Sequence, residues 1–135
     1  MTHWRIRRFE ANYADSNQSK RAKAYATLVE GIDRSLGDLI DHVIEKGVAE
    51  QTIIFFVGDN GSDAPLGDSY SYTSSAPLRG KKATCYEGGM RVPFIAAWAK
   101  PGQANQFPIA SGEIHSAQIG TVMDFFTTIL ELAGN

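Results

Sequence analysis

The sequence contains only one cysteine, Cys85, among its 135 residues. A single thiol cannot form an internal disulfide, and it cannot supply a zinc site built from several cysteines. The neighbours of Cys85 are Thr84 and Tyr86, and no histidine is near it in the sequence. We therefore interpret Cys85 as a buried or incidental thiol rather than as a nucleophile.

Long hydrophobic runs are also absent. No apolar run approaches the roughly 20 residues that are needed to cross a bilayer. The first ten residues, MTHWRIRRFE, contain no hydrophobic core of a signal peptide. From these residues we expect a soluble chain with no membrane span, and its localisation stays open.

Neither sign of charge dominates, because 13 Lys and Arg stand against 15 Asp and Glu, for a formal net charge of -2. The charged residues are interspersed, so the sequence offers no broad basic surface for nucleic acid or anionic lipid. Hydrophobic residues make up 43% of the chain, which is enough to bury the core of one domain. We expect residues 1–135 to form a single domain segment.

The spacing of apolar residues predicts a helix over about residues 17–46. Residues three and four positions apart share one face of a helix, and the residues with this spacing are Leu28, Ile32, Leu36, Leu39, Ile40, Val43 and Ile44. A basic residue and then a glycine, Lys46 and Gly47, are typical of a helix C-terminus. A closing helix is predicted within residues 116–135, which have a similar apolar pattern and end near Ala-Gly.

Two short apolar runs predict strands: QTIIFFVG, residues 51–58, and RVPFIAAW, residues 91–98. Continuous β-branched and aromatic runs are typical of strands covered on both faces, as in the parallel sheets of α/β proteins. We therefore expect an α/β fold with a partial parallel or mixed sheet flanked by helices. Two strands make a thin sheet, which indicates part of a larger domain.

The first strand is followed at once by Asp59 and Asn60, in the stretch FFVGDNGSD. Ligands gather at the carboxyl ends of strands in open α/β sheets, and carboxylate and carboxamide oxygens are the ligands that calcium or magnesium prefers. The alternative is a tight turn, which the dipeptide alone favours because Asp-Asn-Gly is common where chains reverse. Further oxygen ligands, Asp63 and Asp68, lie in a long loop predicted over residues 61–80.

Basic side chains gather around glycines in PLRGKKATCYEGGMRVP, the segment that leads to the second strand. Arg79, Lys81, Lys82 and Arg91 could meet an anion such as sulfate or phosphate at the same sheet edge. The alternative is a solvated basic loop that an ion pair between Glu87 and Arg91 braces. Taken alone, the segment favours this second interpretation.

Taken together, these segments resemble the C-terminal part of the catalytic domain of type I sulfatases, in the alkaline phosphatase superfamily. The matching stretches run in order from about residue 25 to 134: YATLVEGIDRSLGDLIDHVIEKGVAEQTIIFFVGDNG, PLRGKKATCYEGGMRVPFIAAW and MDFFTTILELAG. The coincidence of a helix, a strand, an acidic dipeptide and a glycine-rich lysine segment makes the resemblance specific. It implies a fragment of an alkaline-phosphatase-like α/β/α sandwich, from a parent protein that hydrolyses sulfate esters.

The resemblance implies roles at a few positions. Asp59 and Asn60 match the pair that ligates the family's active-site divalent ion, usually calcium. Lys82 matches the lysine that contacts the sulfate group and stabilises charge as the ester oxygen leaves, so it is expected to be both a catalytic and a substrate-binding residue. The residues that match the family's shaping and bracing positions are Glu87, Gly88, Gly89 and Arg91.

Other parts of the family's site have no counterpart in this sequence. The family's nucleophile is a formylglycine made from Cys or Ser in an upstream Cys/Ser-x-Pro/Ala-x-Arg motif, and no such motif precedes Asp59; the same spacing at Ser75–Arg79 overlaps the stretch that matches the lysine segment. The family's N-terminal Asp pair and upstream histidines are also absent. Cys85 lies in the wrong context, and Thr127 stands where the family commonly has proline. We therefore expect a truncated segment that is inactive alone, with an incomplete calcium site and a formylglycine only in a missing upstream part.

The substrate implied for the parent is a sulfate ester of a carbohydrate or an aryl group, and bacterial sulfatases are often periplasmic or secreted. Two other interpretations stay open. One is a phosphodiesterase or phosphonate hydrolase of the same superfamily, although the Asp-Asn pair and YEGGMRVP favour a sulfatase. The other is a non-catalytic α/β module that forms homo-oligomers through exposed sheet edges.

Overall fold

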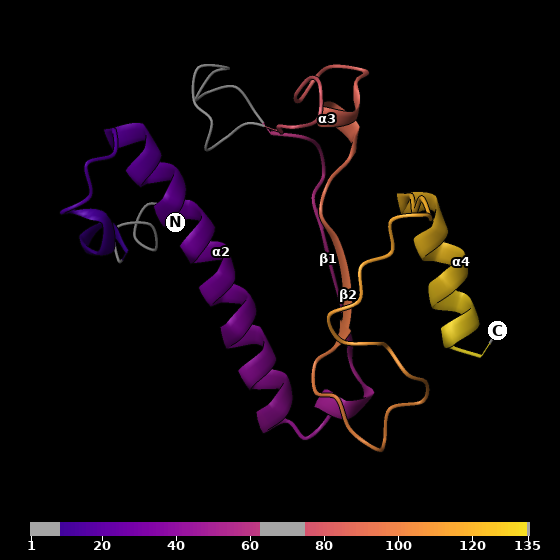
Figure 1. Ribbon diagram of the computed structural model, residues 1–135. Helices are drawn as coiled ribbons and strands as arrows, with labels where there is room; N and C mark the ends of the chain where they lie inside the picture. The colour runs from indigo at the N-terminus through magenta and orange to yellow at the C-terminus, as the bar shows by residue number, and fades with distance from the viewer. Residues whose placement is uncertain (1–8, 63–74, 135) are drawn as a thin grey trace.

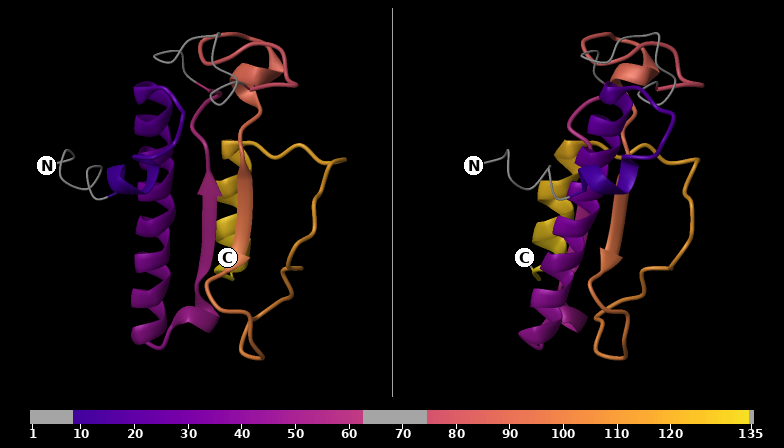
Figure 2. Two further views of the ribbon diagram at one scale, coloured as in Figure 1. Left: turned by 60° about the vertical axis from the view of Figure 1, so that its left-hand side comes forward. Right: turned by 90° about the vertical axis from the view of Figure 1, so that its left-hand side faces the viewer.

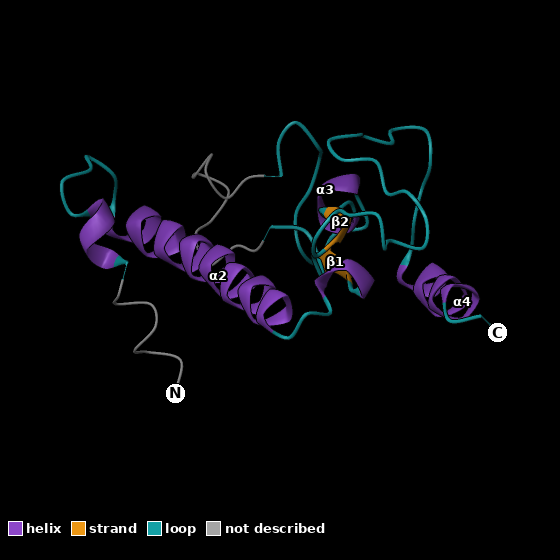
Figure 3. Ribbon diagram, turned by 90° about the horizontal axis from the view of Figure 1, so that it is seen from below, coloured by secondary structure: helices purple, strands orange, loops and turns teal. Residues whose placement is uncertain are grey.

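The computed structural model describes residues 9–62 and 75–134 (Figure 1). The described elements are η1 (Glu10–Tyr13), α2 (Lys20–Glu45), η2 (Ala49–Gln51), β1 (Ile53–Val57), α3 (Glu87–Met90), β2 (Phe94–Trp98) and α4 (Val122–Leu132). The strand pair lies between α2 and α4 (Figures 1 and 3), and α2 runs along its length (Figure 2). This helix, sheet and helix arrangement agrees with the predicted α/β fold.

The long helix α2 has the start and stop signals that the sequence supplies. Ser19 has extended backbone angles, and its Oγ accepts a hydrogen bond from the Ala22 N–H over 3.2 Å, which satisfies one of the donors that a helix start leaves open. After the helix, Gly47 has a φ of 72°, which glycine adopts without a Cβ penalty. The helix predicted over about 17–46 is confirmed as Lys20–Glu45.

The two strands form an antiparallel pair, in which Ile53 lies opposite Trp98 and Val57 opposite Phe94. Both predicted strands are confirmed, but the predicted parallel arrangement is wrong for this pair. The chain leaves β1 and enters β2 at the same end, so no crossover has to carry it back to the start of β1, as a parallel pair would require. A continuous apolar run indicates burial, and burial does not determine strand direction.

The C-terminal helix covers one face of the strand pair through Phe125. Its ring centroid lies 5.1 Å from that of Phe55 and 5.3 Å from that of Phe94, within the range of favourable aromatic pairs. At the other end of β2, Trp98 is buried, packs against the Phe107 ring and donates from Nε1 to the Phe107 carbonyl over 3.0 Å. Aromatic side chains therefore hold both ends of the pair.

The closing helix α4 begins with a capping box. Both the Thr121 N–H and its hydroxyl donate to Asp124 Oδ2, over 2.6 and 2.9 Å, and the Thr121 side chain accepts from the main chain of Asp124. The helix predicted within residues 116–135 is confirmed as Val122–Leu132. None of the helices that the structure describes has both the length and the apolar character that a bilayer crossing requires.

Apolar side chains of the described residues remain widely exposed. Phe126 of α4 is 70% exposed, Ile95 of β2 is 56% exposed, and Ile32 of α2 is 55% exposed. The expected cover on both faces of the strands is therefore incomplete in this part of the chain.

Candidate functional site

The turn that ends β1 meets the glycine-rich segment that precedes β2. The Gly58 N–H donates to the Pro93 carbonyl over 3.0 Å, and the Gly61 N–H donates to the Gly89 carbonyl over 2.9 Å. The antiparallel pairing places the end of β1 and the start of β2 at the same edge, next to α3 (Figure 1). The turn that contains Asp59 is therefore joined to this segment by main-chain hydrogen bonds.

Lys82 lies beside the same turn. Its main-chain N–H donates to the Ser62 carbonyl over 2.9 Å, and Ser62 comes shortly after Asp59 and Asn60 in the sequence. Lys82 and Asp59 are exposed, and Asn60 is half-buried. The three residues singled out from the sequence thus share one end of the strand pair.

Close backbone contacts require glycine at three positions, one between the turn and the glycine-rich segment and two within that segment. A Cβ on Gly61 would meet the Gly88 carbonyl oxygen and lie 2.8 Å from the Gly89 Cα. A Cβ on Gly88 would lie 2.7 Å from the Arg79 carbonyl oxygen, and one on Gly89 would lie 2.6 Å from that of Lys81. No side chain fits between these backbones, so glycine is needed here for contact. The importance of Gly61 was missed from the sequence, because Asp-Asn-Gly is also an ordinary turn.

The turn offers oxygen ligands to a cation. The Asn60 Nδ2 donates to the Gly61 carbonyl over 2.9 Å, so the side-chain oxygen of Asn60 is the atom that remains for a metal. Within residues 9–62 and 75–134 no group of three or more His, Cys, Asp or Glu side chains gathers; Asp63 and Asp68 lie outside these residues. The chemistry of Asp59 and Asn60 fits Ca²⁺, although two ligands are fewer than the six to eight that it takes.

A cleft of about 410 Å³ opens beside this turn. Asn60 and Ser62 from the turn contribute to its walls, as do Arg91 before β2 and Tyr25 of α2. A carboxamide, two hydroxyls and a guanidinium are groups that bind anionic oxygen atoms. The cleft is therefore chemically suited to a small anionic group.

Comparison with known proteins decides the family. The family model described as Sulfatase matches residues 1–135. The chain belongs to the sulfatase family.

Several relatives are similar to this sulfatase chain. N-acetylgalactosamine-6-sulfatase of Mus musculus is 40% identical over 110 residues, which cover 82% of this chain and 19% of the relative. A protein named Sulfatase from Formosa agariphila is 32% identical over 118 residues, with 82% and 19% covered. Steryl-sulfatase of Mus musculus is 30% identical over 130 residues, with 92% and 19% covered. The chain spans about a fifth of the length of these curated relatives.

Two arginines of the sulfatase segment have partners within it. Arg91 Nη1 lies 3.3 Å from Glu87 Oε2 across the short helix α3, which confirms the predicted brace. Both side chains are well exposed, so this pair contributes little to stability. The Arg79 guanidinium lies 3.8 Å above the centre of the Tyr86 ring and also donates to its hydroxyl over 2.7 Å, a cation–π contact. These arginines therefore shape the segment.

The lone cysteine of this sulfatase chain is exposed. The interpretation of Cys85 as a buried thiol is therefore wrong, and the alternative of an incidental thiol remains. The segment around Cys85 is held by neighbouring main-chain bonds, such as that from the Gly88 N–H to the Arg79 carbonyl over 2.7 Å.

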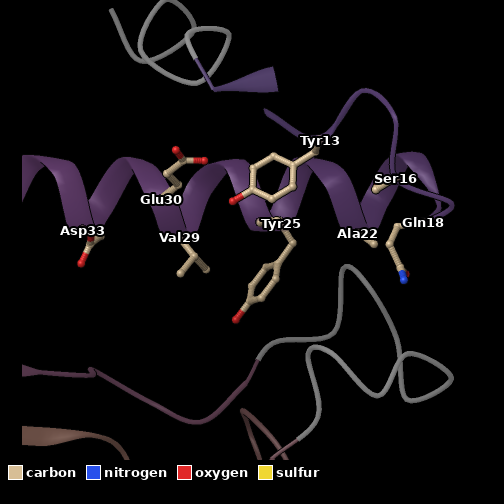
Figure 4. Close-up of a pocket in the computed structure, with 9 residues that line it drawn as sticks. Tyr13, Ser16, Gln18, Ala22, Tyr25, Val29, Glu30 and Asp33 are labelled. Atoms are coloured by element: carbon tan, nitrogen blue, oxygen red, sulfur yellow. The ribbon is translucent and has the colours of Figure 1, made fainter. Parts of the chain in front are cut away.

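A second hollow, a groove of about 730 Å³, lies along the first half of α2 (Figure 4). Tyr13, Tyr25 and Glu30 contribute to its lining. Asn12 Nδ2 donates to Glu30 Oε1 over 2.6 Å, and a hydrogen bond with the Glu30 carboxylate raises the pKa of the Tyr13 hydroxyl above its ordinary value. Asp59, Asn60 and Lys82 do not line this groove, but Tyr25 contributes both to it and to the cleft beside the candidate site of this sulfatase segment.

Proposed function

We propose that this chain is a segment of a sulfuric ester hydrolase, in which Asp59 and Asn60 ligate a divalent cation, calcium, and Lys82 contacts the sulfate group of the substrate. The observation that supports this proposal is the 2.9 Å hydrogen bond from the Lys82 N–H to the Ser62 carbonyl. This bond fixes the lysine segment to the turn that carries the metal ligands.

The proposed role of Lys82 follows from the charge that develops in the reaction. Cleavage of a sulfate ester puts negative charge on the oxygen of the leaving group, and an ammonium group held near that oxygen stabilises it. When bound, a divalent cation supplies charge neutralisation at the sulfate oxygens. Asp59 and Asn60 hold their oxygen atoms at the end of a strand, which is a rigid support for ligands.

We also propose that the 135-residue chain is inactive by itself. No Cys/Ser-x-Pro/Ala-x-Arg motif precedes Asp59, where the formylglycine nucleophile expected for the family would be made. The same spacing at Ser75–Arg79 follows Asp59 and overlaps the stretch that matches the family's lysine segment. The N-terminal Asp pair that completes the family's metal site also has no counterpart in this sequence. Both are assigned to other parts of the parent protein, since the relatives are about five times longer than the matched stretch.

The similarities favour a sulfated carbohydrate as the substrate of the parent. The relatives named N-acetylgalactosamine-6-sulfatase match at 38% to 40% identity, whereas those named steryl-sulfatase match at 30%. An aryl sulfate remains a convenient assay substrate, because it contains the same ester bond with a coloured leaving group.

The test uses the protein expressed from its complete reading frame, which we call the full-frame protein. We expect it to hydrolyse para-nitrophenyl sulfate, and we expect residues 1–135 alone to show no turnover. Lys82→Ala is expected to lower kcat by about 100-fold or more. The matched control is Lys46→Ala, at an exposed lysine next to the end of α2, which should leave kcat unchanged. Turnover by residues 1–135, or an unchanged kcat in Lys82→Ala, would contradict the proposal.

The reading frame itself provides an independent test. The proposal requires a Cys/Ser-x-Pro/Ala-x-Arg motif and a pair of Asp residues encoded upstream of Met1. A frame without them would contradict the proposal and favour a non-catalytic module, and a Ser or Thr nucleophile with additional His ligands would favour the phosphodiesterase alternative.

A further inference from the structure

We infer that Thr84 is a positioning residue for Lys82, an inference that rests on the proposed function. Residues 81–84 form a turn that the hydrogen bond from the Thr84 N–H to the Lys81 carbonyl closes over 3.1 Å. Lys82 occupies the second position of this turn and Ala83 the third. The direction in which the Lys82 side chain leaves the backbone therefore depends on the geometry of this turn.

The Thr84 hydroxyl closes the same turn twice more. Its Oγ1 accepts a hydrogen bond from the Lys81 N–H over 3.1 Å and donates to the Lys81 carbonyl over 2.7 Å. A hydroxyl can do both, because it carries one donor and two acceptor positions. Three hydrogen bonds thus join Thr84 to Lys81 across Lys82, and the side chain of Thr84 supplies two of them.

The backbone of Ala83 indicates that the turn needs this support. Its φ is 66°, in the left-handed region where a Cβ is disfavoured. Turns with a positive φ at the third position usually have glycine or asparagine there. A residue persists in such a conformation when its surroundings over-determine it. The hydroxyl of Thr84 is part of those surroundings.

Two glycines leave room for the Thr84 hydroxyl. A Cβ on Gly80 would lie 2.5 Å from Thr84 Oγ1, and a Cβ on Gly89 would lie 3.0 Å from it. On its other side the turn is bonded to the end of β1, through the Lys82 N–H and the Ser62 carbonyl. Thr84 thereby holds Lys82 in a fixed relation to the turn that carries Asp59.

The test replaces the hydroxyl with a methyl group of similar size, Thr84→Val, in the full-frame protein. We expect this substitution to lower kcat for a sulfate ester by about 10- to 100-fold. Thr84→Ser keeps the hydroxyl, so its kcat is expected to lie within about threefold of that of the unmodified protein. The matched control is Thr52→Val, because the Thr52 hydroxyl donates to the Val48 carbonyl over 2.9 Å at the other end of β1. This variant should retain its kcat.

The way the loss of activity varies with the leaving group of the ester distinguishes a positioning role of Thr84 from a general structural defect. Hydrolysis of an ester whose leaving group has a high pKa depends more on a nearby ammonium group than hydrolysis of the para-nitrophenyl ester does. We therefore expect Thr84→Val and Lys82→Ala to lose more activity on the sulfate ester with the poorer leaving group. If Thr84→Val does not fold, as judged by its circular dichroism, Thr84→Ala is assayed in its place.

Two outcomes overturn the inference but not the proposed function. One is an unchanged kcat in the Thr84 variant when Lys82→Ala is impaired, and the other is an equal loss on all leaving groups. An unchanged kcat in Lys82→Ala instead overturns the proposed function and, with it, the role of Thr84.

Discussion

The main-chain nitrogen of Lys82 lies 2.9 Å from the carbonyl oxygen of Ser62. Because the bond joins two main-chain groups, it does not depend on the side chain of either residue. Substitutions of the Lys82 side chain should therefore change the chemistry of the site while they leave this link in place. The backbone that assembles the site can therefore be altered separately from the side chains that line it.

Gly61→Ala is expected to destabilise the full-frame protein by about 2 to 3 kcal/mol, in the range of overpacking substitutions, because the new Cβ would meet the Gly88 carbonyl. The matched control is Gly37→Ala within α2, where a Cβ has nothing within 4 Å. This change should stabilise the protein by about 1 kcal/mol, since alanine is the better helix former. Denaturant unfolding measures both, and a Gly61→Ala variant as stable as the unmodified protein would contradict the close contact.

Removal of divalent ions with a chelator is expected to abolish turnover by the full-frame protein, and added Ca²⁺ is expected to restore it. Asp59→Asn should raise the Ca²⁺ concentration for half-maximal activity by about tenfold or more, because it removes a charged ligand. Asp41→Asn makes the same change at an exposed position of α2 and should have no effect. Full activity of the chelated protein would argue against a metal at this turn.

Glu50 is expected to stabilise the protein in a pH-dependent way. Its hydrogen bonds with Lys100 Nζ, at 2.9 Å, and with the Ala104 N–H, at 3.4 Å, lower the pKa of its carboxyl below the ordinary value of 4.5. Because the folded-state pKa is the lower one, the contribution is fully present above the unfolded value and is lost as the pH falls through the folded value.

Titration of the Glu50 carboxyl by NMR checks this expectation and should give a midpoint below 4.5. Glu50→Gln should also lose less stability than the unmodified protein when the pH is lowered from about 7 to about 3. A midpoint at or above the ordinary value would show that Lys100 does not stabilise the charged form.

Ala83→Gly is expected to raise stability by about 1 kcal/mol and to preserve kcat, because glycine adopts a positive φ without the Cβ penalty of alanine. Ala83→Val is expected to act in the opposite direction, since β-branched residues are genuine outliers at positive φ. Thermal unfolding of the two variants in the full-frame protein measures the difference. If both variants were equally stable, Ala83 would not hold the left-handed conformation found at 66°.

The features that depend on neighbouring residues were predictable from the sequence. The spacing of apolar residues and the Lys46-Gly47 signal predicted α2, and the apolar runs predicted β1 and β2. The ion pair between Glu87 and Arg91 was also predicted, as the brace of a basic loop, because the two opposite charges lie close together in the sequence. Each of these features requires only a short stretch of chain.

The features that depend on the path of the chain were not predictable in the same way. The antiparallel direction of the strand pair follows from where residues 58–93 return the chain, which an apolar run does not reveal. The short helix α3 contains Gly88 and Gly89, which are poor helix formers, so no helical signal pointed to it. The roles of Asp59, Asn60 and Lys82 came from the resemblance to sulfatases and stay predictions.

The strand register has a consequence for the order in which this protein folds. Pairing of Val57 with Phe94 closes a loop that contains all of residues 58–93, and the entropy of closing a loop opposes the pairing more as the loop lengthens. A helix such as α2 needs only local contacts and can form much earlier. The N–H groups of Gly61 and Lys82 bond across that loop, so their protection against hydrogen exchange during refolding should appear together with the strands, after that of α2.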